Sequence, residues 1–165
     1  MNENYAQSDL PQSAHAGVLR GAYVFARHAA AAGTATGQAV TLLASGAILP
    51  EAESAARQLA SQGIAVSVVS VTSWSELARD GQACEGSGAT SWLAQVLAQT
   101  QGPVVSATDY VRAVPEAVRA YMPPERMYRT LGTDGFGLSD TRAVLRSFFG
   151  VDAARIARTA QQALD

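Results

Sequence analysis

The sequence predicts an α/β fold, in which helices cover both faces of an open and mainly parallel sheet. Short apolar segments rich in β-branched residues alternate with segments whose apolar residues recur at helical spacing, and this alternation is typical of such sheets. A chain of 165 residues suits one domain that buries roughly 70% of the surface exposed in the unfolded state. We expect that domain over residues 17–165, after a polar, extended lead-in over residues 1–16.

The first strand is expected over residues 21–28, at an edge of the sheet. The alanines that follow favour a helix, but the segment itself is aromatic and alternates apolar with less apolar residues, as an edge strand does. The alanine- and glycine-rich residues 29–37 are then interpreted as a mobile hairpin loop.

A βαβ unit follows. Residues 38–46 form a short apolar run that ends at a glycine, and residues 64–71 form the clearest strand of the chain. The helix between them has Pro50 in its first turn and ends at Gly63, and the crossover should be right-handed. Four of its apolar residues fall at helical spacing: Ala52, Ala55, Ala56 and Leu59.

The alternation continues in the next segments. Ser73 precedes Glu76 by three residues, a capping-box spacing that predicts a short helix over residues 74–79. A loop with the sequence ACEGSGATS leads to a helix that starts near Ser91. Residues 102–109 are expected to form the third buried strand.

The remaining elements complete the sheet and its helical layers. A helix over residues 113–124 has Pro115 in its first turn, and residues 126–132 form the fourth parallel strand. Two helices come last, of which Gly150 ends the first and Asp152 caps the second.

Composition excludes several classes of function. All 12 basic residues are arginine, so Schiff-base chemistry and a P-loop lysine are excluded. The net charge is −2 without a basic stripe, which argues against a nucleic-acid partner. The polar N-terminus is no signal peptide, and no apolar run approaches the roughly 20 residues of a membrane span. The single cysteine, Cys84, cannot form an internal disulfide, so a reducing cytoplasm is expected.

No catalytic or metal-binding residue is predicted. The only histidines, His15 and His28, have no acidic residues at ligand spacing. A catalytic triad built on serine or cysteine is equally unexpected, because neither histidine has a suitable partner.

The stretch LGTDGFGLSDTR is a candidate anion or interface loop, formed by Gly135, Phe136, Gly137 and Ser139. Its glycines have the spacing G-x-x-G-x-G after the last strand, so it fails the dinucleotide fingerprint in both spacing and position. We expect a glycine-rich turn in which Ser139 or Asp140 caps the next helix. An anion at that helix N-terminus is the alternative, although the nearby acids oppose it.

A second candidate ligand loop lies where the parallel strands end. Ser45 and Gly46 follow one strand, and Asp109 follows another, so all three are expected at the carboxyl edge of the sheet. A tight turn and a helix cap would explain the same residues without a ligand. No nucleophile elbow is present, since the G-x-S-x-G pattern is missing.

Five stretches together carry a family resemblance: MNENYAQ, LLASGAIL, VSVTSWSELARDGQ, ATDYVRAVPEAVRAYMP and YRTLGTDGFGLSDTRAVLRSFFGVDA. They resemble the C-terminal domain of homodimeric, thiamine-diphosphate-dependent pyruvate dehydrogenase, the bacterial decarboxylating enzyme related to transketolases. The resemblance covers almost the whole chain. It implies a three-layer α/β/α sandwich on a five-stranded, mainly parallel sheet with one antiparallel edge strand.

The resemblance also implies a function for the complete enzyme. That enzyme decarboxylates pyruvate with thiamine diphosphate and Mg²⁺, and it acetylates the lipoyl group of an acyltransferase component. The cofactor motifs of the family belong to earlier domains and have no counterpart in this sequence, so no cofactor is expected in this chain. The domain is expected to be structural, to form the homodimer through a surface that includes Phe136, and to be inactive alone.

Two features leave a second hypothesis open. The loop GSGATS is shorter than the loop that the family usually has there, and fold alone does not determine function. The alternative is therefore a stand-alone small-molecule-binding or regulatory module, which would use the loops at the carboxyl edge of the sheet.

Overall fold

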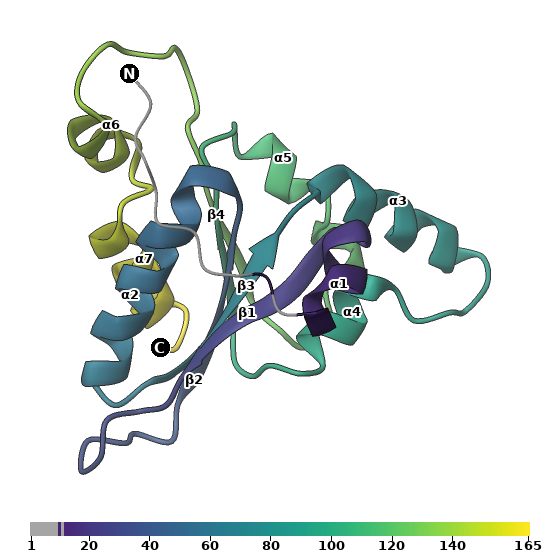
Figure 1. Ribbon diagram of the computed structural model, residues 1–165, viewed down its shortest axis with the longest axis horizontal. Coiled ribbons are helices and arrows are strands. Elements are labelled where there is room, and N and C mark those ends of the chain that lie inside the picture. The colour runs from purple at the N-terminus through teal and green to yellow at the C-terminus, as the bar shows by residue number, and fades with distance from the viewer. Residues whose placement is uncertain (1–9, 11) are drawn as a thin grey trace.

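A computed structural model describes residues 10 and 12–165 and contains a five-stranded sheet in the order β1-β3-β2-β4-β5 (Figure 1). Four strands are parallel, and β1 pairs antiparallel with β3 at the edge, as expected. The strands are β1 (Ala22–His28), β2 (Ala39–Ala44), β3 (Ala65–Val71), β4 (Val104–Ala107) and β5 (Tyr128–Leu131).

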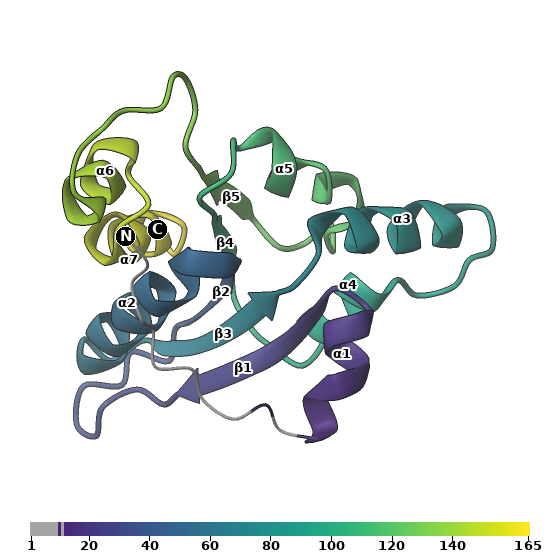
Figure 2. The same ribbon diagram turned by 45° about the horizontal axis from the view of Figure 1, so that its top comes forward.

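Helices form a layer on each face of the sheet, which confirms the three-layer α/β/α fold (Figure 2). One layer contains α2 (Leu49–Ser61) and α7 (Ala153–Gln162). The other contains α3 (Trp74–Glu85), α4 (Trp92–Leu97) and α5 (Ala113–Glu116). The remaining helices are α1 (His15–Leu19) and α6 (Arg142–Phe149), with short 3-10 turns at Gln12–Ala14, Gly46–Ile48 and Arg119–Tyr121. None of the described helices has both the length and the apolarity needed to cross a membrane.

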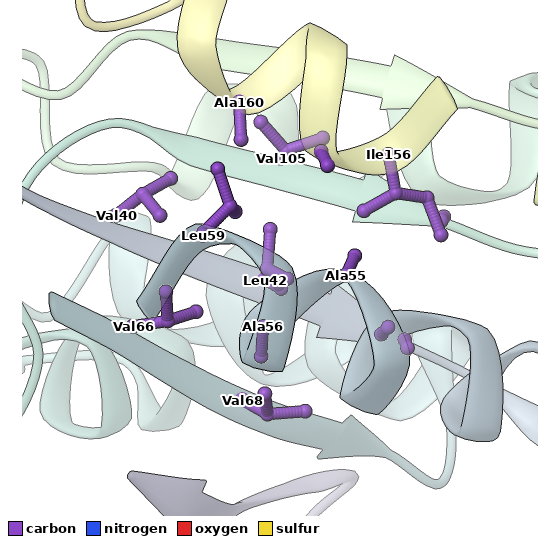
Figure 3. Packing of buried hydrophobic residues seen from close by; sticks show 14 of the residues in the cluster. Val40, Leu42, Ala55, Ala56, Leu59, Val66, Val68, Val105, Ile156 and Ala160 are labelled. Carbon is purple, nitrogen blue, oxygen red and sulfur yellow. The ribbon is translucent and has the colours of Figure 1, made fainter. Parts of the chain in front are cut away.

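The central strand β2 is buried on both faces, as parallel strands are when helices cover both sides. Leu42 belongs to the core under α2 and α7, whereas Leu43 belongs to the core under α3 and α4. Figure 3 shows Ala56 and Leu59 of α2 and Ile156 of α7 packed over the first of these cores. Each fully buried leucine contributes about 2 kcal/mol by removing its side chain from water.

The connection after β1 is not the predicted hairpin. The strand paired with β1 is β3, so the chain passes beyond β3 before it forms β2. This connection packs instead on the C-terminal end of α2, where the amide of Thr36 donates to the carbonyl of Gly63 at 3.0 Å. A Cβ on Gly63 would lie 1.7 Å from the oxygen of Thr34, so the close approach requires a glycine.

Three predicted segments differ in length or type. The lead-in becomes helical at Gln12, while the part over residues 1–9 and 11 lies outside the described residues. Helix α3 runs to Glu85 rather than residue 79, through Gly81, because the ring of Tyr121 packs against that glycine. Helix α5 ends at Glu116 and continues only as a 3-10 turn, so the predicted helix over residues 113–124 was too long.

Arg126 joins three segments at the end of the sheet where β4 begins. Its guanidinium donates to the carbonyls of Gly102 and Leu97 and to the hydroxyls of Thr100 and Thr41, at 2.6 to 2.9 Å. Burial lowers the pKa of this guanidinium, and nearby Glu125 partly opposes that change. The group remains charged, because arginine does not lose its proton in proteins.

Replacing Arg126 with methionine should lower the free energy of unfolding by about 3 kcal/mol, because the four acceptors lose a charged donor. Urea unfolding of the two proteins measures the difference. Arg129→Met is the matched control, since Arg129 is exposed on β5 and should change stability by less than about 0.5 kcal/mol. Equal effects of the two substitutions would contradict a structural role for Arg126.

Glu116 and Arg119 form a second link, between α5 and β5. The carboxylate of Glu116 accepts from Arg119 Nε at 2.5 Å and from the hydroxyl of Thr130 at 2.5 Å. Hydrogen bonding to Arg119 lowers the pKa of Glu116 from 4.5 to about 2, although burial acts in the opposite direction. Arg119 also lies over the ring of Tyr128, with its Cζ 4.9 Å from the ring centroid.

Because the pKa of Glu116 is lowered by folding, its contribution to stability is complete above pH 4.5 and is lost as the pH falls toward 2. NMR titration of the Glu116 carboxyl carbon should show a midpoint about two units below that of an ordinary glutamate. In Arg119→Gln the midpoint should rise toward the ordinary value. If Arg119→Gln leaves the midpoint unchanged, Arg119 is not the main cause of the lowered pKa of Glu116.

Candidate ligand crevice at the carboxyl edge of the sheet

The carboxyl ends of β2 and β4 meet at a topological switch point. The chain leaves β2 toward β3 on one side, and it leaves β4 toward β5 on the other. Their following helices, α2 and α5, cover opposite faces of the sheet. In open α/β sheets, ligands bind in the crevice outside such a pair of strands.

The structure brings together the residues that were predicted at this edge. Gly46 has φ +54°, and a Cβ there would lie 3.7 Å from Asp109 Oδ1. Asp109 is exposed, and its carbonyl accepts from the hydroxyl of Thr133 at 2.6 Å, which ties it to the glycine loop. The carboxylate of Asp109 is therefore the group of this crevice that is available to a ligand.

Ser45 supports the crevice through a buried hydrogen bond and not through an exposed side chain. Its side chain is buried, and its hydroxyl lies 2.8 Å from that of Thr108, which in turn accepts from the amide of Tyr110. This buried pair links the end of β2 to the end of β4. The position of Ser45 thus favours a structural role over direct contact with a ligand.

Thr141 caps α6, so the prediction that Ser139 or Asp140 does so was wrong. The Thr141 hydroxyl accepts from the amide of Val144, because Thr141 is extended and directly precedes the helix. Asp140 instead accepts from the amide of Thr141 at 2.6 Å, while Ser139 lies two residues too early to reach the helix. The carboxylate of Asp140 beside this N-terminus disfavours an anion there.

The glycine loop forms one wall of a cavity of about 550 Å³ next to Asp109. Gly135 has φ +89°, and Phe136 at the tip of the loop is 95% exposed. Gly135 and Gly137 line the cavity together with Asp109, so the two predicted loops form one crevice. A larger cavity of about 1110 Å³ adjoins it on the side of Ser45 and Gly46.

Apolar side chains are exposed beside this crevice. Leu138 is 52% and Val144 is 50% exposed, and α6 has no buried residue at all. We call Phe136, Leu138 and Val144 the loop surface. Contiguous exposed apolar patches are typical of sites at which proteins contact other molecules.

Among the described residues that line the cavity of about 550 Å³, Asp109 has no histidine or cysteine beside it, and Cys84 lies on α3. A histidine–carboxylate pair borders the adjoining cavity instead, where Oε1 of Glu53 lies 3.2 Å from Nε2 of His28. Among the described residues, no three side chains of histidine, cysteine, aspartate or glutamate are grouped to hold a metal ion.

Glu51 and Arg146 join α2 to α6 and to the start of α7, and no local sequence pattern singles them out. Glu51 accepts from Arg146 and from the amide of Ala153, each at 2.9 Å. Arg146 also donates to the carbonyl of Ala47 next to the crevice at 3.3 Å. Nothing in the sequence pairs two residues that are 95 positions apart.

Comparison with known proteins gives a family match. Residues 21–152 match the model of the transketolase-like TK C-terminal domain. The chain is 43% identical to a pyruvate dehydrogenase E1 component from Mycobacterium tuberculosis over 92% of its length, and 39% identical to one from Pseudomonas aeruginosa over 99%. The structure is similar to transketolase from Leishmania mexicana, with a TM-score of 0.58, 25% identity and 90% of this chain covered.

The match spans only a small part of each relative. It covers 17% and 19% of the two curated pyruvate dehydrogenase E1 components and 18% of the Leishmania transketolase chain. The chain therefore corresponds to less than a fifth of the length of these proteins.

Glu51→Gln should loosen α6 and the start of α7, because a neutral amide cannot accept from both Arg146 and Ala153 as the carboxylate does. We expect amide hydrogen exchange in α6 to become on the order of tenfold faster, while β2 and β4 keep their protection. Glu85→Gln is the control, because Glu85 is exposed at the end of α3. Unchanged exchange in α6 would show that Glu51 does not hold this helix.

Proposed function

Because the chain belongs to the transketolase-like C-terminal domain family, we propose that it is the C-terminal domain of a pyruvate dehydrogenase E1 component. The complete enzyme would decarboxylate pyruvate and acetylate the lipoyl group of an acyltransferase component. The observation that carries this proposal is the identity of about 40% to E1 components over nearly the whole chain. In this proposal the domain's own part is structural, with the exposed loop surface as its contact to the rest of the enzyme.

We propose that thiamine diphosphate and Mg²⁺ bind outside the part of the chain that the structure describes. The described residues contain no cluster of metal ligands that would hold Mg²⁺. The exposed carboxylate of Asp109 would oppose a diphosphate in the crevice, although Arg142 and Arg146 line the same cavity. The proposal therefore assigns both cofactors to the rest of a longer cytoplasmic enzyme.

The loop surface is proposed to pack against the rest of this enzyme, in a homodimer. Phe136 is almost fully exposed, and Leu138 and Val144 are each at least half exposed. Aromatic residues such as Phe136 are typical anchors of protein interfaces. The position of the loop surface beside the crevice would place Asp109 close to that interface.

Activity should be restored when the chain is added to a shortened partner. The partner is the Mycobacterium tuberculosis E1 component without the region that this chain matches. We expect no pyruvate-dependent dye reduction by the chain alone with thiamine diphosphate and Mg²⁺, and clear reduction by the mixture. Turnover by the chain alone, or full activity of the shortened partner alone, would overturn the proposal.

Phe136→Ser should weaken this assembly by roughly tenfold or more, because an aromatic anchor of an interface is lost. The stability of the chain itself should not change, since Phe136 is 95% exposed. Met127→Ser is the matched control, at the opposite end of β5 and 47% exposed. Equal weakening by the two variants would place the interface elsewhere.

A further inference from the structure

A third cavity, of about 660 Å³, lies at the outer edge of β5, and Phe149 separates it from the switch-point crevice. Its walls are the end of β5, the turn between α6 and α7, and the first turns of α7. Three arginines line it: Arg112, Arg155 and Arg158. The cavity concentrates positive groups in a protein whose net charge is −2.

Arg112 is anchored beside this cavity by two bonds to one carboxylate. Its amide donates to Asp134 Oδ1 at 2.9 Å, and its Nε donates to Asp134 Oδ2 at 2.5 Å. Gly132 allows the close approach, because a Cβ there would lie 2.9 Å from both Cγ and N of Arg112. The bonds from Arg112 are also what lowers the pKa of Asp134, so that this carboxylate is ionised and already occupied.

Arg155 and Arg158 lie one turn apart on α7, on the side opposite Ile156 and the rest of the core. Gly150 ends α6 with φ +68° and reverses the chain, which directs α7 back along the sheet. A Cβ added to Gly150 would lie 3.3 Å from Cγ of Arg155, so the aliphatic part of the Arg155 side chain lies along this turn. Within the described part of the chain, neither side chain has a bonded acid.

Two carboxylates line the same cavity, and both are already bound. Asp134 is paired with Arg112, and Asp152 caps α7 by accepting from the amide of Arg155 at 2.8 Å. Three guanidinium groups thus face two occupied carboxylates. The formal charge of the lining is +1, from three arginines and two aspartates, and Arg155 and Arg158 are the guanidinium groups without a bonded carboxylate. Their planar donors suit a carboxylate.

Aromatic side chains form the remaining wall. Phe148 and Phe149 pack edge to face with their ring centroids 5.1 Å apart, and both line the cavity. Phe148 is 67% exposed, so a ligand placed over it would remove apolar surface from water. An anion with an apolar part would therefore bind more tightly, because it could contact both the arginines and Phe148.

We propose that this cavity binds a small organic carboxylate. The carboxylate lies between Arg155 and Arg158, and the apolar part of the ligand covers Phe148. The site is separate from the switch-point crevice, with Phe149 between the two cavities. Its occupancy does not depend on the function proposed for the complete enzyme.

Titration of the chain with acetate, hexanoate and inorganic phosphate at low salt tests the site, with the Nε–Hε NMR signals of arginine as the readout. Hexanoate should shift the signals of Arg155 and Arg158 in a saturable way and bind about tenfold more tightly than acetate. Burying about two of its four additional CH₂ groups would suffice, since each buried CH₂ contributes about fourfold. Phosphate should bind more weakly than hexanoate, since it cannot cover Phe148.

Substitutions then distinguish binding at this specific site from a general attraction of anions to the arginines of the protein. Arg158→Gln should weaken hexanoate binding by roughly tenfold, because a charge-assisted bond is lost, whereas Arg57→Gln on α2 should not change it. Phe148→Ser should abolish the preference for hexanoate over acetate. Shifts that do not saturate, shifts that Arg57→Gln reduces equally, or tighter binding of phosphate would overturn the proposal.

Discussion

The position of β2 between two parallel neighbours is the constraint on which the other features depend. Its pairing with β3 and β4 aligns the carboxyl ends of the strands at one edge of the sheet. Leu42 and Leu43 then face opposite helical layers, so each layer must cover its own half of the core. The switch point beside Gly46 and Asp109 follows from the two directions in which the chain leaves this edge.

Polar links hold the helices and loops around this sheet. Arg126 joins the segments at the end where β4 begins, and the hydroxyls of Ser45 and Thr108 join β2 and β4 at the other end. Glu51 binds both Arg146 and the start of α7. Each of these groups is wholly or partly buried, and each is satisfied by partners from distant parts of the chain, as buried polar groups must be.

Local patterns predict the strands and most helices, because β-branched runs, helical spacing and capping residues act over a few positions. Ser73, Ser91 and Asp152 cap the helices that the sequence assigns to them. Interactions between distant residues escape such patterns, as the bond between Arg126 and Thr41, 85 positions away, shows. The sequence places Gly46 and Asp109 at one edge of the sheet, but it does not show that Ser45 is buried or that Glu51 fixes α6.

Helix α7 has a consequence for the order in which the protein acquires its core. Ile156, Ala157 and Ala160 cover the same apolar cluster as α2, which forms about a hundred residues earlier in the chain. Until the ribosome has synthesised α7, the part of this cluster that α7 covers remains open to water and to other chains. Apolar surface exposed in this interval is prone to aggregation, so the completion of α7 limits how long the nascent chain is at risk.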